Sequence, residues 1–410
     1  MSANNLKFKV EDKTINDFDA VSLYPSAMAR IEGFIKGAPK TLKENELNYS
    51  KISKYDFYII EIEILKVGII RKFPLMSKIK SDGTRDYTND MKGEKIIVNK
   101  YDLEDLIKFQ QVEFKINSGY YFNEGFNETI TKEIKYLFGK RKTLKKEGNK
   151  CEILYKLLMN SSYGKLIQKA HDKGVKFFNN KIDFMKFYER NYNEMIRAYN
   201  YDDENKEKFK VEYKTAIGDF FAEPHLGSQI LSMSKRIMNE IICLAEDLNL
   251  MIYYQDTDSI HIEDKSIKIL ETEFKKLYNR DLIGSNMGEF HSDFNDKFNI
   301  NGQIIKVNNV VSKKLIILGK KSYIDQLEGT DNEDNKHINF HVRLKGIPSE
   351  AISHYIKTNN LKSEYELYEK LFNGEIIEFD ITAGGKKCCF EFLNNYSINT
   401  KTDFKRKIKF

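Results

Sequence analysis

The chain has 410 residues, which is long enough for two or three domains. Of these residues 41% are hydrophobic and 13% aromatic, a composition that excludes a disordered or fibrous protein. No apolar run approaches the roughly 18 residues of a membrane span, and the first residues lack the apolar core of a secretory signal. Four scattered cysteines favour a reducing compartment over a disulfide framework or structural zinc. The formal net charge is only +6, which neither requires nor excludes an anionic partner such as nucleic acid, so the distribution of charge along the chain is more informative.

The apolar pattern predicts a mixture of strands and helices along the whole chain. In chain order these are a strand over 14–23, a helix from Tyr24, short strands with one helix near 102–111 between 55 and 127, helices over 130–147 and 150–163, a helix over 229–248, and a β-hairpin with an acidic turn. Gly148-Asn149 separates two of these helices and so predicts a helical hairpin.

Three carboxylates occupy positions that a buried strand would not favour. Asp256 and Asp258 lie in the predicted hairpin turn, and Asp19 lies in or at the end of the first strand. Buried carboxylates cost free energy unless they are paired or bind a metal. On adjacent strands they would suit two Mg²⁺ ions about 3.5–4 Å apart. The alternative interpretation is that Asp-Thr-Asp is simply a favourable turn.

Basic residues concentrate in one segment, residues 132–150, which contains eight Lys or Arg and two Glu. The residues expected to share a helix face here and on the following helix are Arg141 with Lys145, and Lys156 with Asn160, Tyr163 and Gly164. Two such faces would suit the binding of a triphosphate between them. The alternative is a solvated lysine-rich face.

Four motifs occur in the order found in family B DNA polymerases. Asp19-Ala-Val-Ser-Leu-Tyr-Pro-Ser26 resembles the DxxSLYPS motif, Lys156-Leu-Leu-Met-Asn-Ser-Ser-Tyr-Gly164 resembles KxxxNSxYG, Tyr254-Gln-Asp-Thr-Asp-Ser259 resembles YxDTDS, and Lys321-Ser-Tyr323 resembles KxY. The resemblance implies an α+β fold shaped like a right hand. Its palm would hold an antiparallel sheet, with helical-hairpin fingers, a small thumb and insertions between the palm motifs.

The resemblance also implies a role for each matching residue. Asp19 and Asp258 would be the principal ligands of two Mg²⁺ ions, for which Mn²⁺ could substitute, with Asp256 and the main-chain carbonyl of Ala20 beside them. Tyr24 would pack under the sugar of the incoming nucleotide and exclude a 2′-hydroxyl, which implies dNTP substrates. A primer 3′-hydroxyl would attack the α-phosphate in line, and pyrophosphate would leave.

The remaining implied residues contact the nucleotide or the DNA. Those implied to bind the nucleotide are Ser22 and Leu23 through backbone amides, Arg141, Lys145, Lys156 and Asn160 near the triphosphate, and Tyr163 against the nascent base pair. Those implied to bind DNA are Gly164, Tyr254, Thr257, Lys321, Tyr323 and Lys345. Phosphate contacts would make DNA binding independent of sequence and sensitive to salt.

The long gaps between the motifs favour the protein-primed branch of the family, found in phages, linear plasmids and related viruses. The expected domains are palm residues 1–30 and 215–348, an insertion over 31–128, fingers over 129–165, a candidate second insertion over 166–214, and a thumb over 349–410. In that branch the second insertion helps to encircle the template and gives processivity and strand displacement.

Family members usually carry a 3′–5′ exonuclease before these motifs. Only 18 residues precede Asp19, so we expect no intrinsic proofreading. The expected partners are primer-template DNA, dNTPs, a terminal protein primer and a separate exonuclease chain, without a membrane, in the cytoplasm of a host cell. The alternatives are a non-catalytic DNA-binding subunit and a polymerase that depends on an N-terminal partner. The three intact aspartates favour an active enzyme.

Overall fold

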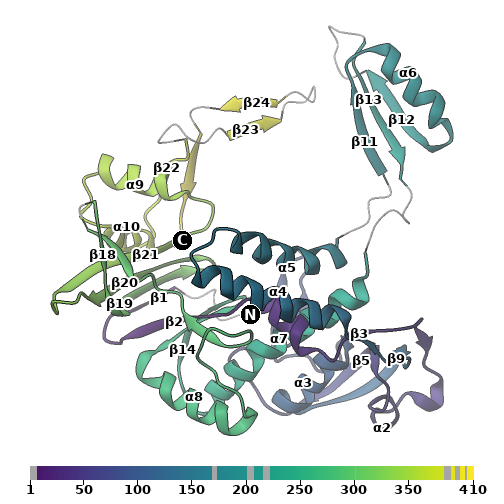
Figure 1. Cartoon of the computed structure of the whole chain (residues 1–410), viewed down its shortest axis with the longest axis horizontal. Coiled ribbons are helices and arrows are strands. Elements are labelled where there is room, and N and C mark those ends of the chain that lie inside the picture. The colour runs from purple at the N-terminus through teal and green to yellow at the C-terminus, as the bar shows by residue number, and fades with distance from the viewer. Residues whose placement is uncertain are drawn as a thin grey trace.

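The computed structural model describes residues 7–168, 173–200, 207–215, 222–300, 302–382, 389–392, 398–401 and 404–410. At its centre lies an antiparallel sheet, here called the main sheet, with strands β1 (Phe8–Val10), β2 (Ile15–Ala20), β14 (Ile252–Asp256), β15 (Ser259–Glu263), β16 (Phe290–Ser292), β19 (Asn308–Gly319), β20 (Ser322–Thr330) and β21 (Lys336–Leu344). Its order is β14-β15-β2-β19-β20-β21, with β1 paired to β19 and β16 to β2 (Figure 1).

Helices cover one face of the main sheet because strands and helices share a buried apolar cluster. Phe18 of β2 and Ile260 of β15 lie in the same cluster as Ile237 and Ile241 of α7 (Pro224–Asp247). α1 (Leu23–Arg30) and α8 (Asp264–Tyr278) also contribute to this cluster. The helix predicted over 229–248 is therefore present, and it begins one turn earlier, where a proline occupies its first turn.

Between β2 and the helical hairpin, the chain forms a second sheet with its own core. Its order is β4-β9-β5-β8, and alternate residues of β5 are buried in a separate apolar cluster. The elements of this unit are β3 (Phe34–Ile35), β4 (Lys40–Thr41), α2 (Tyr49–Ile52), β5 (Phe57–Val67), β6 (Ser77–Ile79), β7 (Arg85–Tyr87), β8 (Lys95–Asn99), α3 (Lys100–Gln110), β9 (Val112–Phe122) and β10 (Phe126–Asn127).

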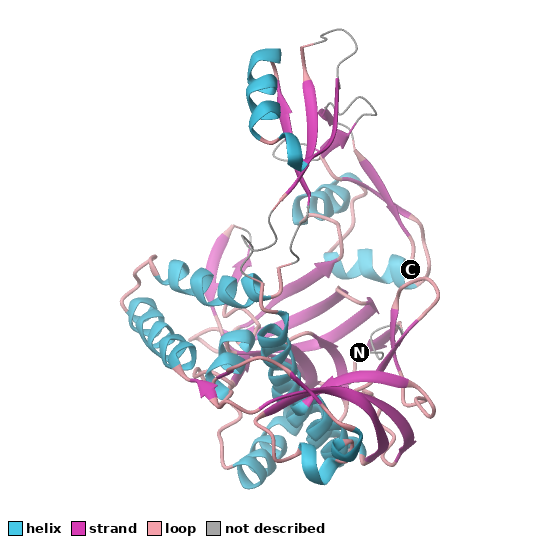
Figure 2. Cartoon of the chain, turned by 90° about the vertical axis from the view of Figure 1, so that its right-hand side faces the viewer, coloured by secondary structure: helices cyan, strands magenta, loops and turns pink. Residues whose placement is uncertain are grey.

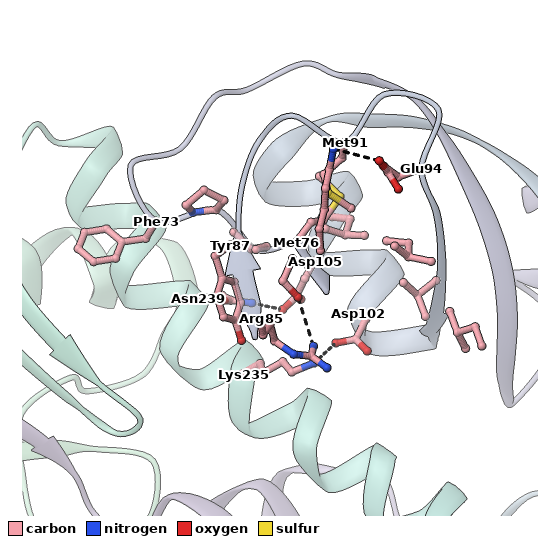
Figure 3. A pocket seen from close by; sticks show the side chains of 18 of the residues that line it. Phe73, Met76, Arg85, Tyr87, Met91, Glu94, Asp102, Asp105, Lys235 and Asn239 are labelled. Carbon is pink, nitrogen blue, oxygen red and sulfur yellow. Dashed lines mark hydrogen bonds and ion pairs between the residues drawn. The ribbon is translucent and has the colours of Figure 1, made fainter. Parts of the chain in front are cut away.

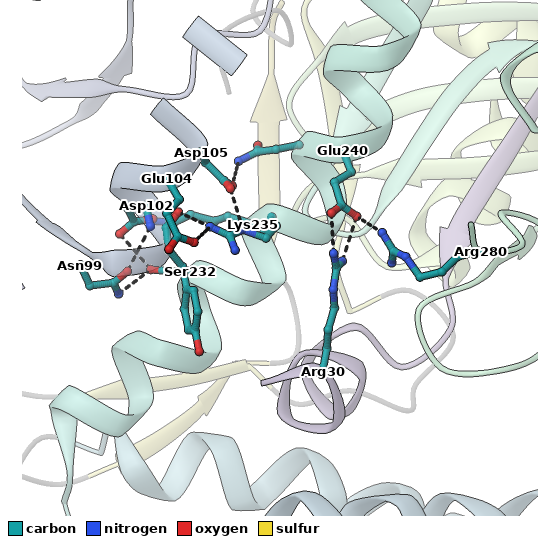
Figure 4. Close-up of polar contacts among 12 residues, drawn as sticks. Arg30, Asn99, Asp102, Glu104, Asp105, Ser232, Lys235, Glu240 and Arg280 are labelled. Atoms are coloured by element: carbon teal, nitrogen blue, oxygen red, sulfur yellow. Dashed lines mark hydrogen bonds and ion pairs between the residues drawn. The ribbon is translucent and has the colours of Figure 1, made fainter. Parts of the chain in front are cut away.

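Polar contacts attach both α3 and α1 to α7 (Figure 4). Asn99, which caps α3, donates from Nδ2 to Ser232 Oγ at 2.8 Å. On the other side of α7, Glu240 binds Arg30 of α1 and also Arg280, whose Nη2 lies 2.6 Å from Glu240 Oε2. These contacts hold the second sheet and the helix that follows β2 against the same helix.

The predicted helical hairpin is present as α4 (Thr129–Lys146) and α5 (Glu152–Leu166), both of which contact α1. α4 ends where predicted because Gly148 adopts a left-handed φ of 67°. Its N–H donates to the carbonyl of Lys145, and the N–H of Asn149 donates to that of Leu144. The break thus satisfies carbonyls that the end of α4 would leave open.

A small unit stands away from the rest of the molecule (Figure 1). It consists of β11 (Lys173–Phe178), α6 (Lys181–Arg190), β12 (Met195–Asn200) and β13 (Phe209–Lys214), with strand order β11-β13-β12. Aromatic side chains form its interior: Phe184 stacks on Phe209 with ring centroids 4.2 Å apart, and Phe178 contacts Phe187 at 5.3 Å. This unit therefore has a core of its own.

The C-terminal part packs on the main sheet through Leu367 and Leu371, which lie in one cluster with Ile316 of β19 and Ile324 of β20. The remaining elements are β17 (Lys297–Ile300), β18 (Gln303–Lys306), α9 (Ser349–Thr358), α10 (Glu364–Phe372), β22 (Ile377–Asp380), β23 (Cys389–Phe392), β24 (Ile398–Lys401) and β25 (Lys405–Ile408). The predicted α+β fold with an antiparallel sheet and a helical hairpin is confirmed (Figure 2). Within the described ranges, no helix is both long and apolar enough to cross a membrane.

Candidate active site

The three predicted aspartates meet at one end of the main sheet. Asp19 is the penultimate residue of β2, Asp256 ends β14, and Asp258 lies in the turn between β14 and β15. The register pairs Ser259 with Asp19, and the N–H of Ala20 donates to the carbonyl of Asp258 at 2.8 Å. Strand pairing therefore brings residues more than 200 positions apart to one point.

The backbone is strained at three residues around this point. Ser22, Thr257 and Lys321 have left-handed φ values of 53°, 52° and 59°, a conformation that costs free energy for residues other than glycine. Thr257 begins the two-residue turn of the β14–β15 hairpin, where positive φ is required. Its Oγ1 donates to Asp256 Oδ1 at 3.2 Å. Such strain is typical of a functional site.

The electrostatics of the aspartates favour a bound cation. Burial, followed by the nearby charge of Asp258, raises the pKa of Asp19 to about 7. Burial and the neighbouring Asp256 raise the pKa of Asp258, although a backbone hydrogen bond opposes the shift. A hard divalent ion bound between half-buried carboxylates would offset the repulsion between their negative charges.

These carboxylates line a cavity of about 230 Å³. The residues predicted from sequence that line it are Asp19, Asp256, Thr257, Asp258, Lys321 and Tyr323. Four further lining residues were not predicted: Asp17, Ser259, Asp293 and Arg343.

Asp293 is the clearest of the missed residues because, with Asp17, it brings the carboxylates that line the cavity to five. It follows β16, whose Phe290 pairs with Ala20 of β2, and its N–H donates to the carbonyl of Asp17 at 2.9 Å. Arg343 Nη2 lies 4.0 Å from Asp293 Oδ2. No motif marks either residue; only the pairing of β16 with β2 would have indicated the position of Asp293.

The YxDTDS and KxY segments contact each other directly. The N–H of Lys321 donates to Tyr254 Oη at 2.8 Å, and Lys321 Nζ lies 3.7 Å from Asp256 Oδ2. The rings of Tyr254 and Tyr323 are 4.8 Å apart. Lys345 is exposed just beyond β21, does not line the cavity, and its N–H donates to Ser322 Oγ.

The helical hairpin contacts the segment after β2. Arg141 Nη1 donates to Ser22 Oγ at 3.1 Å, and its Nε donates to Glu152 Oε2 at 2.9 Å. Tyr163 stacks on Tyr24 with ring centroids 4.4 Å apart and planes 9° from parallel. The stack joins the DxxSLYPS and KxxxNSxYG motifs.

The other predicted nucleotide-binding residues are divided by burial. Leu23 is buried, so only its backbone is free to contact a ligand. Those with exposed side chains are Lys145, Lys156 and Asn160. Gly164, which was predicted to bind DNA, is also exposed. Lys156 is close enough to Asp19 for its charge to oppose the rise in that carboxyl's pKa.

A larger cavity of about 740 Å³ lies away from the aspartates, between β8, the β6–β7 hairpin, α3 and α7 (Figure 3). None of the site residues predicted from sequence lines it. Its carboxylates already have partners: Asp102 lies 3.3 Å from Lys235 Nζ, and Asp105 accepts from Asn239 at 2.9 Å. The chemistry therefore favours the smaller, acidic cavity as the active site.

The donor set fits Mg²⁺, which binds through one or two carboxylates and completes its shell with substrate phosphates and water. Asp19 and Asp258 supply such carboxylates on adjoining elements. Across the part of the chain that the structure describes, no three Asp, Glu, His or Cys side chains are already arranged so that they could hold a metal ion by themselves. The protein alone thus offers a partial ligand set, which suits an ion that arrives with phosphate.

The sequence model of the organellar and viral type B DNA polymerases matches residues 3–246. Because this match covers more than half of the chain, the chain belongs to the organellar and viral type B DNA polymerases. No curated protein sequence matched the chain.

Among solved structures, the chain is similar to phi29 DNA polymerase. The complex with primer-template DNA and incoming nucleotides is 17% identical with a TM-score of 0.57, and the alignment covers 99% of this chain and 61% of that one. The binary complex with primer-template DNA is 16% identical with a TM-score of 0.58, covering 98% of this chain and 58% of the other. The chain spans about three fifths of the length of these polymerases.

The resemblance to family B polymerases and the expected fold are therefore confirmed. The domain boundaries, the roles of individual residues, the priming mode and the absence of proofreading stay predictions. The family includes organellar as well as viral enzymes, so the cytoplasmic location also stays a prediction.

Proposed function

We propose that this chain is the polymerase part of a DNA-directed DNA polymerase, which adds dNTPs to a primer 3′-hydroxyl. The main support is the convergence of Asp19, Asp256 and Asp258 with Lys321 and Tyr323 around one cavity at the end of the main sheet. In this proposal the main sheet is the palm, the α4–α5 hairpin the fingers, and residues 349–410 the thumb.

Asp19 and Asp258 would hold two Mg²⁺ ions, with Asp256 and the carbonyl of Ala20 beside them. When bound, these ions would lower the pKa of the primer hydroxyl and neutralise charge on the transferred phosphate. Lys321, fixed by its bond to Tyr254, would orient the primer end. Holding the reacting groups in line is a large part of catalysis in phosphoryl transfer.

On the nucleotide side, Arg141, Lys145 and Lys156 would neutralise the triphosphate. Arg141 is already oriented toward this site by its hydrogen bond to Ser22. The Tyr24–Tyr163 stack would form the surface on which sugar and base lie, with Tyr24 excluding a 2′-hydroxyl.

The partners of this activity would be primer-template DNA and dNTPs. The solved phi29 complexes contain these ligands in a similar fold, which supports the proposal. A terminal protein primer and a separate exonuclease chain are further proposed partners. The self-contained unit over 173–214 lies in the candidate second insertion and would help to enclose the template.

Primer extension with Mg²⁺ tests the proposal. We expect extension by the wild type and none by Asp258→Ala, because a principal metal ligand is lost. Asp90→Ala, at an exposed aspartate that does not line the acidic cavity, should extend like the wild type.

A non-catalytic DNA-binding subunit is the alternative. It would bind primer-template DNA without extending it, and Asp258→Ala would leave that binding unchanged. Extension only after a separate exonuclease chain is added would instead indicate a partner-dependent polymerase.

A further inference from the structure

The main sheet contains a seam between β2 and β19. β15 pairs with β2 along its whole length, from Ser259 to Glu263, whereas β19 pairs with β2 only through Ser312 and Ile15. The seam separates the strands that carry the predicted metal ligands (β14, β15 and β2) from β20, which carries Tyr323 and follows Lys321. The backbone pairing between β2 and β19 is therefore too short to connect these two halves of the sheet firmly.

A buried side-chain link crosses this seam. His261 on β15 lies beside Asp17 on β2 and reaches Asp325 on β20, with 3.4 Å between Nδ1 and Asp17 Oδ1 and 3.2 Å between Nε2 and Asp325 Oδ2. All three residues are at most 1% exposed. Asp17 and Asp19 point to the same face of β2 because they are two residues apart. The link thus lies directly beside the acidic cavity.

The charges within the link are complementary. Burial opposes a charged imidazole, but Asp17 and Asp325 outweigh it and raise the pKa of His261. Burial likewise opposes an ionised Asp325, and His261 outweighs it to lower the pKa of that carboxyl. These directions favour a hydrogen bond between His261 Nε2 and an Asp325 carboxylate, which lie within hydrogen-bond distance of each other. His341 also faces this link, with its Nδ1 3.6 Å from Asp325 Oδ2. The other charged or titratable groups that face the link are Asp293, Tyr254, Tyr323 and Arg343.

A buried ion pair of this kind is a poor source of stability, because desolvation offsets much of the Coulomb attraction. Its value lies in fixing one arrangement of the strands that it joins. We propose that His261 is a positioning residue that holds the strands bearing Asp19 and Asp258 in a fixed relation to the strand that orients the primer end. This inference rests on the proposed polymerase function.

Single-turnover incorporation of one nucleotide on a preformed primer-template complex tests the inference, with rates normalised to the active fraction. We expect His261→Leu and Asp325→Asn each to slow incorporation by about ten- to a hundredfold, since small misplacement of reacting groups is costly. The affinity for primer-template DNA should change less than about threefold. His261→Gln, whose amide can still donate to Asp325, should recover part of the rate.

His337→Leu is the matched control. It breaks another histidine–aspartate pair, with Asp331 at 2.7 Å, located where β20 turns into β21 and away from the seam. Rates like the wild type in His261→Leu and Asp325→Asn would overturn the inference, as would strictly additive effects in the double variant. If His261→Leu does not fold, the Asp325→Asn and His261→Gln rates decide.

Hydrogen exchange separates failure of this inference from failure of the proposed function. Peptides from β15 and β20 should lose protection together in Asp325→Asn but not in His337→Leu. Unchanged protection would overturn the link whether or not the protein extends primers. If protection is lost in Asp325→Asn as expected but the wild type extends no primer, the polymerase function is overturned, and the positioning role with it.

Discussion

At the scale of single residues, the stacked pair Tyr24–Tyr163 joins two motifs that are 130 positions apart in the chain. Tyr24 lies near the aspartates, since the charge of Asp258, after burial, contributes to raising the pKa of its phenol. A ring in this position would meet the sugar of a nucleotide whose phosphates lie at the aspartates. The proposed sugar selectivity therefore depends on the ring rather than on the hydroxyl.

Tyr24→Val should weaken discrimination against ribonucleotides by at least about tenfold, because the ring that blocks the 2′-hydroxyl is removed. The measurement is the ratio of kcat/KM for a dNTP to that for the matching rNTP. Tyr24→Phe keeps the ring and should retain the selectivity of the wild type. Equal use of both nucleotides by the wild type would contradict the assigned role.

The raised pKa of Asp19, about 7, predicts a pH dependence of metal binding. A carboxyl that binds its proton more tightly in the folded state destabilises that state as pH rises from about 4 through about 7. Mg²⁺ binds the ionised carboxylate and reverses this loss. The rise in Tm on adding Mg²⁺ should therefore be larger at about pH 8 than at about pH 6.

Thermal unfolding with and without Mg²⁺ measures this effect. Asp19→Asn, which cannot ionise, should show a smaller Mg²⁺ effect with weaker pH dependence. An equal shift at both pH values in the wild type would count against Asp19 as a metal ligand.

At the scale of elements, an ion pair within the α4–α5 hairpin engages one of the cations assigned to the triphosphate. Arg141 on α4 donates both to Glu152 at the start of α5 and to Ser22 before α1. Glu152 holds Arg141 near the site, but it also competes with an incoming phosphate for the same guanidinium. Arg141 would exchange a carboxylate for a phosphate when nucleotide binds.

Glu152→Gln should lower the KM for dNTPs by about two- to fivefold, the scale expected for a partly exposed ion pair. Arg141→Ala should raise the KM because a phosphate-binding cation is lost. Steady-state extension at saturating primer-template measures both. Glu128→Gln removes the exposed pair with Lys132 near the start of α4 and serves as the control. A higher KM in Glu152→Gln would show that Glu152 mainly orients Arg141.

At the scale of the whole molecule, the main sheet, the second sheet and the hairpin all meet at α7 or α1, whereas the unit over 173–214 projects away from them (Figure 1). Lys173 and Lys214 at its two ends pair with each other in one register. The unit can therefore be excised and replaced by a short linker without separating the flanking chain ends.

Excision of 173–214 should leave single-nucleotide incorporation within about threefold of the wild type, because none of the described residues of that unit lines the acidic cavity. Product length per binding event, measured with a trap for free enzyme, should fall because the template is no longer enclosed. An unchanged product length would contradict the proposed role of this unit in processivity.

Local sequence was enough to predict the family, the main helices and the acidic hairpin turn of this protein. The DxxSLYPS, KxxxNSxYG and YxDTDS motifs are contiguous, so they identified the family, and helical periodicity located α4, α5 and α7 within a few residues. The hairpin turn that carries Asp256 and Asp258 is also a local feature, since a short acidic turn between two apolar strands is visible without any partner.

The tertiary structure alone decided which distant side chains meet. Asp293 and Arg343 line the acidic cavity, and His261 reaches Asp325 across the seam, only because of the order and register of strands in the main sheet. Strand pairing is non-local, and a shift of one residue would turn every side chain to the opposite face. The sequence thus determined the chemical groups of the site, and the packing of the sheet determined their arrangement.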